Sequence, residues 1–297
     1  MELQYELMVF TLFMCLAAGI FLVQGVLAFL DTGKKVQVPA LIVSVVALGI
    51  GGIGSFLHLQ HVDRIFNGFG NLTSGITQEL IAIVVFVIAL IVYFIMIRRS
   101  GEGRVARWVS IMAIVVSAIL IVVVALSYMM AARPAWNTFL LPVMFLANGF
   151  FFGSLCVACL SGFVKDDEGG SFSAKLSWIA GIVAAVVTAA YTVFLATLSS
   201  AFTDVGHYFD PTQPTKPMED VSSAFTSIFT GDLALLFWVG VVLIGLVVAI
   251  VLAFLSTKKE GMTLAAFAGG ALICALIGGF CFRVIFYSLG FSVFLFY

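Results

Sequence analysis

The chain has 297 residues, of which 63% are hydrophobic and only 10% are charged, and its formal net charge is −1. An ordinary soluble domain is about 45–50% apolar and about 25% charged, so this chain carries more apolar surface than a core of its size can bury. The composition excludes a soluble enzyme and a disordered chain. The near-zero net charge excludes a nucleic-acid binder, because there is no basic field to hold phosphates.

Eight apolar runs follow one another along the chain, each close to the roughly 20 residues that a membrane-spanning helix needs. No stretch between them is long enough for a soluble domain. The sequence therefore predicts an all-α integral membrane protein, a single domain built as a bundle of eight transmembrane helices. The predicted spans are residues 7–30, 38–59, 79–97, 105–130, 139–163, 176–200, 233–255 and 263–289.

The distribution of Lys and Arg predicts which side of the membrane each loop faces, because cytoplasmic loops are enriched in these residues. The loops after the first, third, fifth and seventh spans carry ten of them, whereas the other three loops carry three. The acidic start MELQYE argues against a cleaved signal peptide. We therefore expect both termini on the outer, extracytoplasmic side. Residues 201–231, which hold three of the six prolines, are expected to form an extramembrane loop on that side.

Ionisable residues inside membrane spans are costly to bury, so each one is a candidate functional residue. Glu79 opens the third predicted span, Arg283 lies in the second half of the eighth, and His58 ends the second. Tyr128 lies near the end of the fourth span, and Arg133 follows it. With the predicted orientation all five lie toward the outer face, and we find no comparable cluster in the cytoplasmic half. An acid, an imidazole and a guanidinium at one depth could exchange protons with a buried polar molecule.

Each of these residues also has a structural interpretation. His58 can sit in the headgroup region, and Glu79 can be an N-terminal helix charge favoured by the dipole. Arg283 can be a counter-ion for Glu79 or can extend to the interface. Tyr128 can belong to the ordinary aromatic belt of a membrane protein. The sequence leaves these alternatives open.

The sequence predicts neither haem nor a metal site in this chain. A haem held by two histidines needs both on facing helices, and of His58, His61 and His207 only His58 is expected at membrane depth. Cys156 and Cys159 have a short spacing but lie inside an apolar span, where we expect them to pack as small apolar residues.

Four segments of the chain resemble the DmsC family, the membrane-anchor subunits of dimethyl-sulfoxide-reductase-type molybdoenzymes. The second predicted span and the loop after it are similar to that family's Gly-rich second helix and the acid that opens its third helix. In this similarity His58 and Glu79 take the positions of the family's quinol-site histidine and glutamate. The segments that carry the resemblance are residues 7–12, 51–80, 128–138 and 283–287.

The resemblance implies a membrane anchor that oxidises a quinol, typically menaquinol, in anaerobic respiration. Electrons would pass to a ferredoxin-like subunit with four 4Fe–4S clusters, and then to a catalytic subunit with a molybdenum bis-guanine-dinucleotide cofactor. The anchor would lie in the bacterial cytoplasmic (inner) membrane, with its partners on the outer face. His58 and Glu79 would take the quinol protons and Arg283 would stabilise developing negative charge, with Tyr128 and Arg133 at the rim.

Two other functions are left open by the residues. A proton-coupled secondary transporter could use Glu79 as its coupling site, but transporters usually show inverted repeats and polar residues at the midplane, which we do not find. A purely structural anchor without a quinone site would keep quinol-linked electron transfer after His58→Ala and Glu79→Gln. The terminal substrate is not indicated by the sequence.

Overall fold

The computed structural model describes residues 4–58, 70–100, 104–198 and 227–291. The regular elements of these residues are helices, and eight helical segments are long and apolar enough to cross a membrane, which confirms the predicted number of spans. In chain order they are α1 (Tyr5–Phe29), α2 (Gln37–His58), α3 (Gly75–Ser100), α4 (Arg107–Leu126), α5 (Leu140–Phe163), α6 (Asp167–Ala196), the continuous pair η3 (Leu236–Val248) and α8 (Ala249–Ser256), and α9 (Gly261–Ser288).

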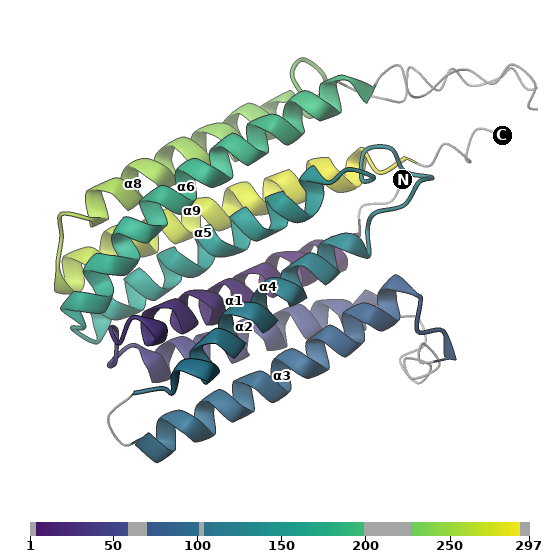
Figure 1. Ribbon diagram of the computed structural model, residues 1–297. Helices are drawn as coiled ribbons and strands as arrows, with labels where there is room; N and C mark the ends of the chain where they lie inside the picture. The colour runs from purple at the N-terminus through teal and green to yellow at the C-terminus, as the bar shows by residue number, and fades with distance from the viewer. Residues whose placement is uncertain (1–3, 59–69, 101–103, 199–226, 292–297) are drawn as a thin grey trace, which may run out of the picture.

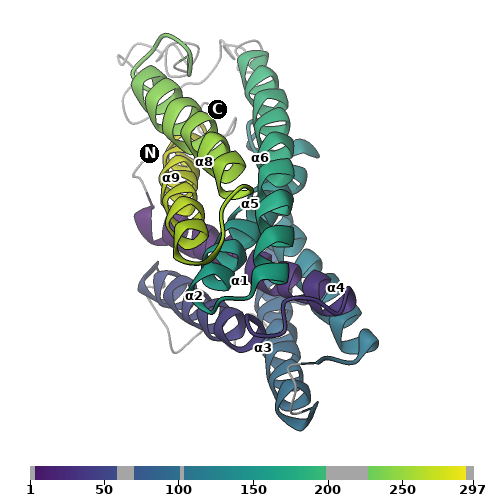
Figure 2. The same cartoon turned by 90° about the vertical axis from the view of Figure 1, so that its left-hand side faces the viewer.

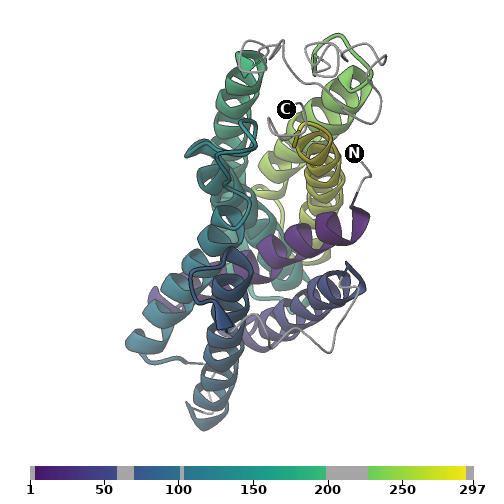
Figure 3. The ribbon, with the colours of Figure 1, turned by 90° about the vertical axis from the view of Figure 1, so that its right-hand side faces the viewer.

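The helices form two neighbouring groups (Figures 1 and 2). Helices α1 to α4 make the first group, in which α1 packs on α2 and α4, and α4 packs on α3. Helices α5, α6, η3–α8 and α9 make the second group. The groups meet where α1 packs against α5, and α3 lies at the edge of the first group farthest from the second (Figure 3).

The central position of α1 and α5 follows from their sequences. Both are apolar on all sides, and 72% of the most apolar window of each is buried, against 33–44% for the other spans. Close approach of their backbones depends on glycine, because a Cβ at Gly19 would collide with the carbonyl of Gly149, and one at Gly153 would collide with Gly19. Small residues of this kind let membrane helices pack tightly without a hydrophobic driving force between them.

Large apolar side chains cover the outside of the bundle. Ile42, Ile88, Val186 and Val251 are among many that are more than half exposed, and they come from helices of both groups. Such a surface is stable in contact with lipid and would aggregate in water. The outer faces of α2, α3, α6 and α8 are therefore lipid-facing.

One end of the bundle carries both the first described residue, Gln4, and the last, Phe291 (Figure 1). We call it the termini-bearing end; α2, α4 and α6 end there and α3 and α5 begin there. Which side of the membrane this end faces stays a prediction. Residues 201–226 of the predicted outer loop lie outside the described residues, and residues 227–231 form turns that lead into η3.

At the opposite end a single carboxylate joins the two groups. Asp166 caps α6 by accepting a hydrogen bond from the Gly169 N–H at 3.1 Å, and its other oxygen accepts from the N–H groups of Lys35 and Val36 at 2.8 and 3.2 Å. The cap explains why α6 begins at Asp167, before the apolar run that opens the predicted span at residue 176. A capped helix N-terminus also favours the acidic residues of its first turn, so the polar segment 167–175 is helical.

Candidate functional site

Arg283 is the most deeply buried charge of the described chain, with 2% of its surface exposed. It lies on α9 close to the termini-bearing end and reaches across to α1. Its Nε donates to Thr11 Oγ1 at 2.9 Å, Nη2 donates to the Thr11 carbonyl at 3.1 Å, and Nη1 donates to the Gly279 carbonyl at 3.0 Å. The guanidinium also lies 5.4 Å from the centre of the Phe145 ring. All of these partners are electrically neutral.

The sequence allowed Arg283 to be a counter-ion for Glu79, and no such ion pair forms. Both residues instead interact electrostatically with the same pair of tyrosines. Tyr287 donates a hydrogen bond to Tyr128 at 2.8 Å, and both tyrosines lie within electrostatic reach of Glu79 and of Arg283. Both tyrosines are therefore near enough to the carboxyl group and to the guanidinium to interact with both. Tyr128 follows the end of α4, and burial raises the pKa of its hydroxyl, so this group stays protonated.

Glu79 lies in the second turn of α3, because the helix begins at Gly75 and not at residue 79. Gly75 packs directly on Ser127, which brings the start of α3 to the end of α4. Ser127 Oγ lies 3.4 Å from Glu79 Oε1, but its shorter hydrogen bond, 2.8 Å, goes to the Val124 carbonyl. Within the described residues the carboxyl group therefore has one weak partner, and most of its acceptor capacity is free.

An aromatic cluster covers this network from the segment between α4 and α5. The Trp136 ring stacks on Phe286 at 4.8 Å, meets the edges of Tyr128 and Tyr287, and donates its Nε1–H to the Phe286 carbonyl at 2.8 Å. Arg133 lies over the same ring, 4.3 Å from its centre. Arg133 is thus part of the covering layer, and it lies within electrostatic reach of Tyr287.

His58 is the last residue of α2 and is exposed. Within the described part of the chain it makes no hydrogen bond or ion pair, so the structure does not join it to Glu79 or Arg283. The residues that follow it, including His61, Arg64 and Asn67, lie outside the described residues. The role of His58 therefore stays a prediction from the sequence.

Two apolar grooves open on the lipid-facing surface near the termini-bearing end. The first, of about 300 Å³, lies between α3 and α4, and Gln78, next to Glu79, lines it together with Val85, Ile119 and Val123. The second, of about 310 Å³, lies between α1 and α2, and Leu57, next to His58, lines it. Each groove offers an apolar path from the membrane toward one of the two predicted proton-accepting residues.

A buried polar cluster also lies near the opposite end, where the sequence predicts no cluster comparable to that of the outer face. The Gln24 amide donates to the Gln37 carbonyl at 2.8 Å, and the Tyr93 hydroxyl donates to Gln37 Oε1 at 2.8 Å. These residues are uncharged, so a search for ionisable residues overlooked them. The cluster lies far along α1 from Thr11, and no described contact connects the two.

Three residues of the site were not predicted from the sequence, namely Thr11, Ser127 and Tyr287. Tyr287 stands in the terminal segment that carried the family resemblance, and that segment was the available signal for it. Thr11 and Ser127 gave no signal, because a single hydroxyl in an apolar run is commonly bonded to its own helix. Among the described residues no three His, Cys, Asp or Glu side chains come together as metal ligands would.

Comparison with known proteins identifies the family. No curated protein matches the chain. The model of the family described as Polysulphide reductase, NrfD, matches residues 4–292, which is nearly the whole chain and includes every residue of the site above. The chain therefore belongs to this family, whose members are membrane subunits of respiratory complexes of the molybdoenzyme type and partner with iron–sulfur and molybdopterin subunits.

Proposed function

We propose that this chain is a DmsC-like membrane anchor that oxidises a quinol, menaquinol in the first instance, and passes the electrons to an iron–sulfur partner. The observation that carries the proposal is the buried network of Arg283, Tyr287, Tyr128 and Glu79, which lies at one end of the bundle. It combines a cation, two neutral hydroxyls and a proton acceptor within a few side chains of an apolar groove.

Arg283 suits the stabilisation of a negative oxygen. A buried charge is normally paired with an opposite charge, because leaving it alone in a low-dielectric site is costly. The partners of Arg283 among the described residues are neutral oxygens, the Phe145 ring and the Cys15 thiol, and no carboxylate pairs with it there. A quinol that loses a proton acquires negative charge on oxygen, and the field of Arg283 lowers the free energy of that state.

Glu79 suits the acceptance of a quinol proton. Oxidation of a quinol to a quinone releases two electrons and two protons, so the site needs acceptors for the protons as well as a path for the electrons. Among the described residues the Glu79 carboxyl accepts one long hydrogen bond, from Ser127 at 3.4 Å, which leaves it able to accept a proton. In the proposal Glu79 takes one hydroxyl proton and His58, at the same end of the bundle, takes the other.

The groove between α3 and α4 suits the isoprenoid tail. It is lined almost entirely by aliphatic side chains, and it begins beside Glu79 at Gln78. A tail lying along Val123 and Ile119 would place its ring next to Ser127 and Tyr128. The groove between α1 and α2, which ends beside His58, is the other route, and the two make different predictions for mutagenesis.

The proposed partners are a ferredoxin-like subunit with four 4Fe–4S clusters and a catalytic subunit with the molybdenum bis-guanine-dinucleotide cofactor. They would dock at the termini-bearing end, close to the network, on the outer face of a bacterial cytoplasmic membrane. Two electrons would leave the quinol toward the first cluster. Because quinol oxidation and electron exit would lie on the same side, little charge would cross the membrane during turnover.

The test compares Glu79→Gln with Glu168→Gln in membranes that contain the assembled complex. Glu168 is an exposed carboxylate in the first turn of α6, at the opposite end. Removal of a general base typically lowers a rate by about 10²–10⁴-fold. We expect such a loss of quinol-dependent electron transfer in Glu79→Gln and none in Glu168→Gln, with equal amounts of complex on the membrane.

Two further variants test which of the two grooves holds the isoprenoid tail of the quinol. Val123→Trp fills the groove between α3 and α4, and Ile53→Trp fills the groove between α1 and α2. We expect the first to raise the KM for quinol and the second to leave it unchanged. If quinol-dependent electron transfer were unaltered in both Glu79→Gln and His58→Ala, the result would support the alternative of a purely structural anchor without a quinone site. Proton-coupled transport by the purified chain in liposomes, abolished by Glu79→Gln, would instead establish the transporter.

A further inference from the structure

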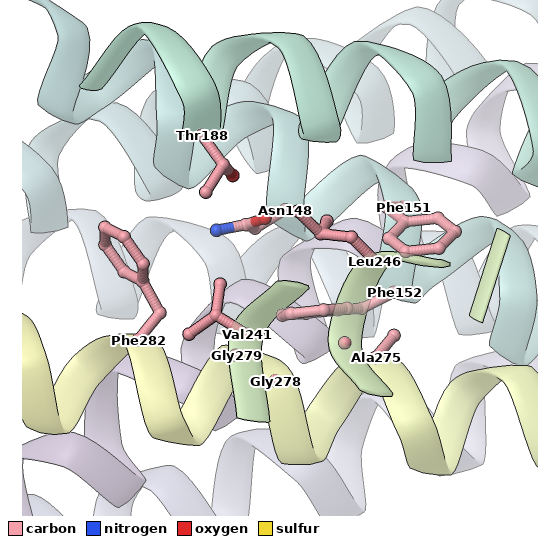
Figure 4. Close-up of a pocket in the computed structure, with 11 residues that line it drawn as sticks. Asn148, Phe151, Phe152, Thr188, Val241, Leu246, Ala275, Gly278, Gly279 and Phe282 are labelled. Carbon is pink, nitrogen blue, oxygen red and sulfur yellow. The ribbon is translucent and has the colours of Figure 1, made fainter. Parts of the chain in front are cut away.

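A small cavity lies inside the second helix group and adjoins the network described above. It is bounded by α5, α6, η3 and α9, and its volume is about 20 Å³ (Figure 4). A cavity needs about 10–15 Å³ to hold one water molecule, so this space is large enough for water and too small for an organic ligand. Its lining is mostly apolar, with phenyl rings from Phe152 and Phe282.

Two polar side chains enter this apolar lining. Asn148 of α5 is only 9% exposed, and its amide makes no hydrogen bond within the described part of the chain. Figure 4 shows the amide nitrogen directed into the space between Thr188, Val241 and Phe282. Thr188 of α6, which is 5% exposed, borders the same space.

The backbone explains why the space stays open. Gly245 of η3 and Gly278 of α9 touch each other backbone to backbone, and a Cβ on either one would collide with the other. Gly279 also lines the cavity without a side chain to fill it. The helix that borders the cavity, η3, is a π-helix over 13 residues. A π-helix is wider than an α-helix, and π-helical turns are frequent at functional sites.

We propose that this cavity is a water-binding site, in which Asn148 and Thr188 hold one ordered water molecule in the middle of the second helix group. Apolar cavities of this size stay dry, but a buried amide without a partner strongly favours a water molecule that can bond to it. An amide supplies two donors and an acceptor, and a threonine hydroxyl supplies a donor and acceptors, which together give a water the two to four partners that it needs.

The site is separate from the proposed quinol site but adjoins it. The carbonyl of Gly279, which lines the cavity, accepts the hydrogen bond from Nη1 of Arg283. The guanidinium therefore bonds to a residue that also borders the proposed water site. The proposal does not depend on quinol chemistry, because it rests on Asn148, Thr188 and the volume of the cavity.

The test is radiolytic hydroxyl-radical labelling of the full chain in native membranes. A millisecond X-ray pulse splits a bound water into radicals that oxidise the side chains beside it, whereas a buried side chain in a dry region stays unmodified. We expect oxidation of Phe282 and Phe152, which are 3% and 2% exposed, and no oxidation of Phe86, a fully buried ring of the first group. Phe282 and Phe152 as unreactive as Phe86 would overturn the proposal without any mutation.

Variants of Asn148 and Thr188 test whether these two side chains hold the water. Asn148→Leu and Thr188→Val keep the approximate volume and remove the polar groups, and we expect each to cause a loss of label at Phe282 and Phe152. Thr192→Val is the matched control, because the Thr192 hydroxyl bonds the Thr188 carbonyl within α6 and does not line the cavity. Labelling that persists in Thr188→Val, which changes the fold least, would refute the assignment.

Discussion

Replacement of Arg283 by methionine tests separately what this buried cation contributes to the stability of the chain and to the rate of quinol oxidation. Methionine has a similar length and no charge, so Arg283→Met removes the guanidinium and its three hydrogen bonds without opening a large cavity. The structure predicts a small effect on stability and a large effect on quinol oxidation. Both consequences follow from the neutral partners of Arg283.

The stability of the chain should change little. Hydrogen bonds from a charged group contribute about 1.5–3 kcal/mol each, so the three bonds at 2.9, 3.0 and 3.1 Å form a sizeable favourable contribution. The desolvation of an unpaired buried ion costs several kcal/mol in the opposite direction, and replacement of buried ions by apolar residues is often neutral or stabilising. We therefore expect the free energy of unfolding to change by less than about 2 kcal/mol.

The rate of quinol oxidation should fall sharply. Removal of one preorganised electrostatic contact to a developing oxyanion typically lowers a rate by about 10²–10³-fold, or about 2.7–4 kcal/mol. We expect a loss of this size in Arg283→Met. Arg283→Lys keeps the charge but not the planar fork that bonds Thr11 and Gly279 together, so it should recover only part of the rate.

The assay measures electron transfer from a menaquinol analogue in membranes, and again with a reduced viologen dye that feeds electrons to the partner subunits directly. The dye-driven rate reports an intact complex and should be unchanged. Arg99→Met, which removes an exposed charge at the opposite end of α3, is the control. A quinol-driven rate within twofold of wild type in Arg283→Met would refute the role assigned to this charge.

Three changes test the packing, each measured as thermal unfolding in detergent with a fluorophore that reacts with the buried free cysteines. Asp166→Ala removes the cap of α6 and the acceptor for the turn between α1 and α2, and should destabilise the chain by about 2–4 kcal/mol. Trp136→Phe leaves the Phe286 carbonyl without its side-chain donor, and should cost about 1–3 kcal/mol. Gly19→Leu forces α1 away from Gly149 of α5, and should cost about 3 kcal/mol or more. Unfolding temperatures equal to wild type would contradict the corresponding contact in each case.

The number of membrane helices was predictable because it depends on local composition. A run of about 20 apolar residues is a helix in lipid whatever surrounds it, since every backbone group must bond within the segment. Helix ends were less predictable. Asp166 caps α6 through its local bond with Gly169, so that helix starts in a polar segment ahead of the apolar run used to predict the span. No local pattern indicates the other contact of Asp166, with Lys35, because these residues are 131 positions apart.

The candidate site was partly predictable for a related reason. Glu79, Tyr128 and Arg283 stood out because polar and charged groups are rare in apolar spans. In the structure Glu79 and Arg283 both lie within electrostatic reach of Tyr128 and its partner Tyr287. Their partners were not visible in the sequence. Thr11 and Arg283 are 272 positions apart, and the hydrogen bond between them exists because α1 also contacts α9 where the two helix groups meet.

The sequence by itself therefore determined the class of protein, its eight spans and the rarity of charge that marks a site, because these depend on the transfer of each segment from water to lipid. Only the tertiary structure decided which side chains each charged or polar residue contacts. It gave Arg283 neutral partners and no direct contact with Glu79, left His58 exposed, and directed the amide of Asn148 into a cavity. Helix packing sets these relations through the positions of a few glycines and caps, and residues far apart in the chain supply the contacting groups.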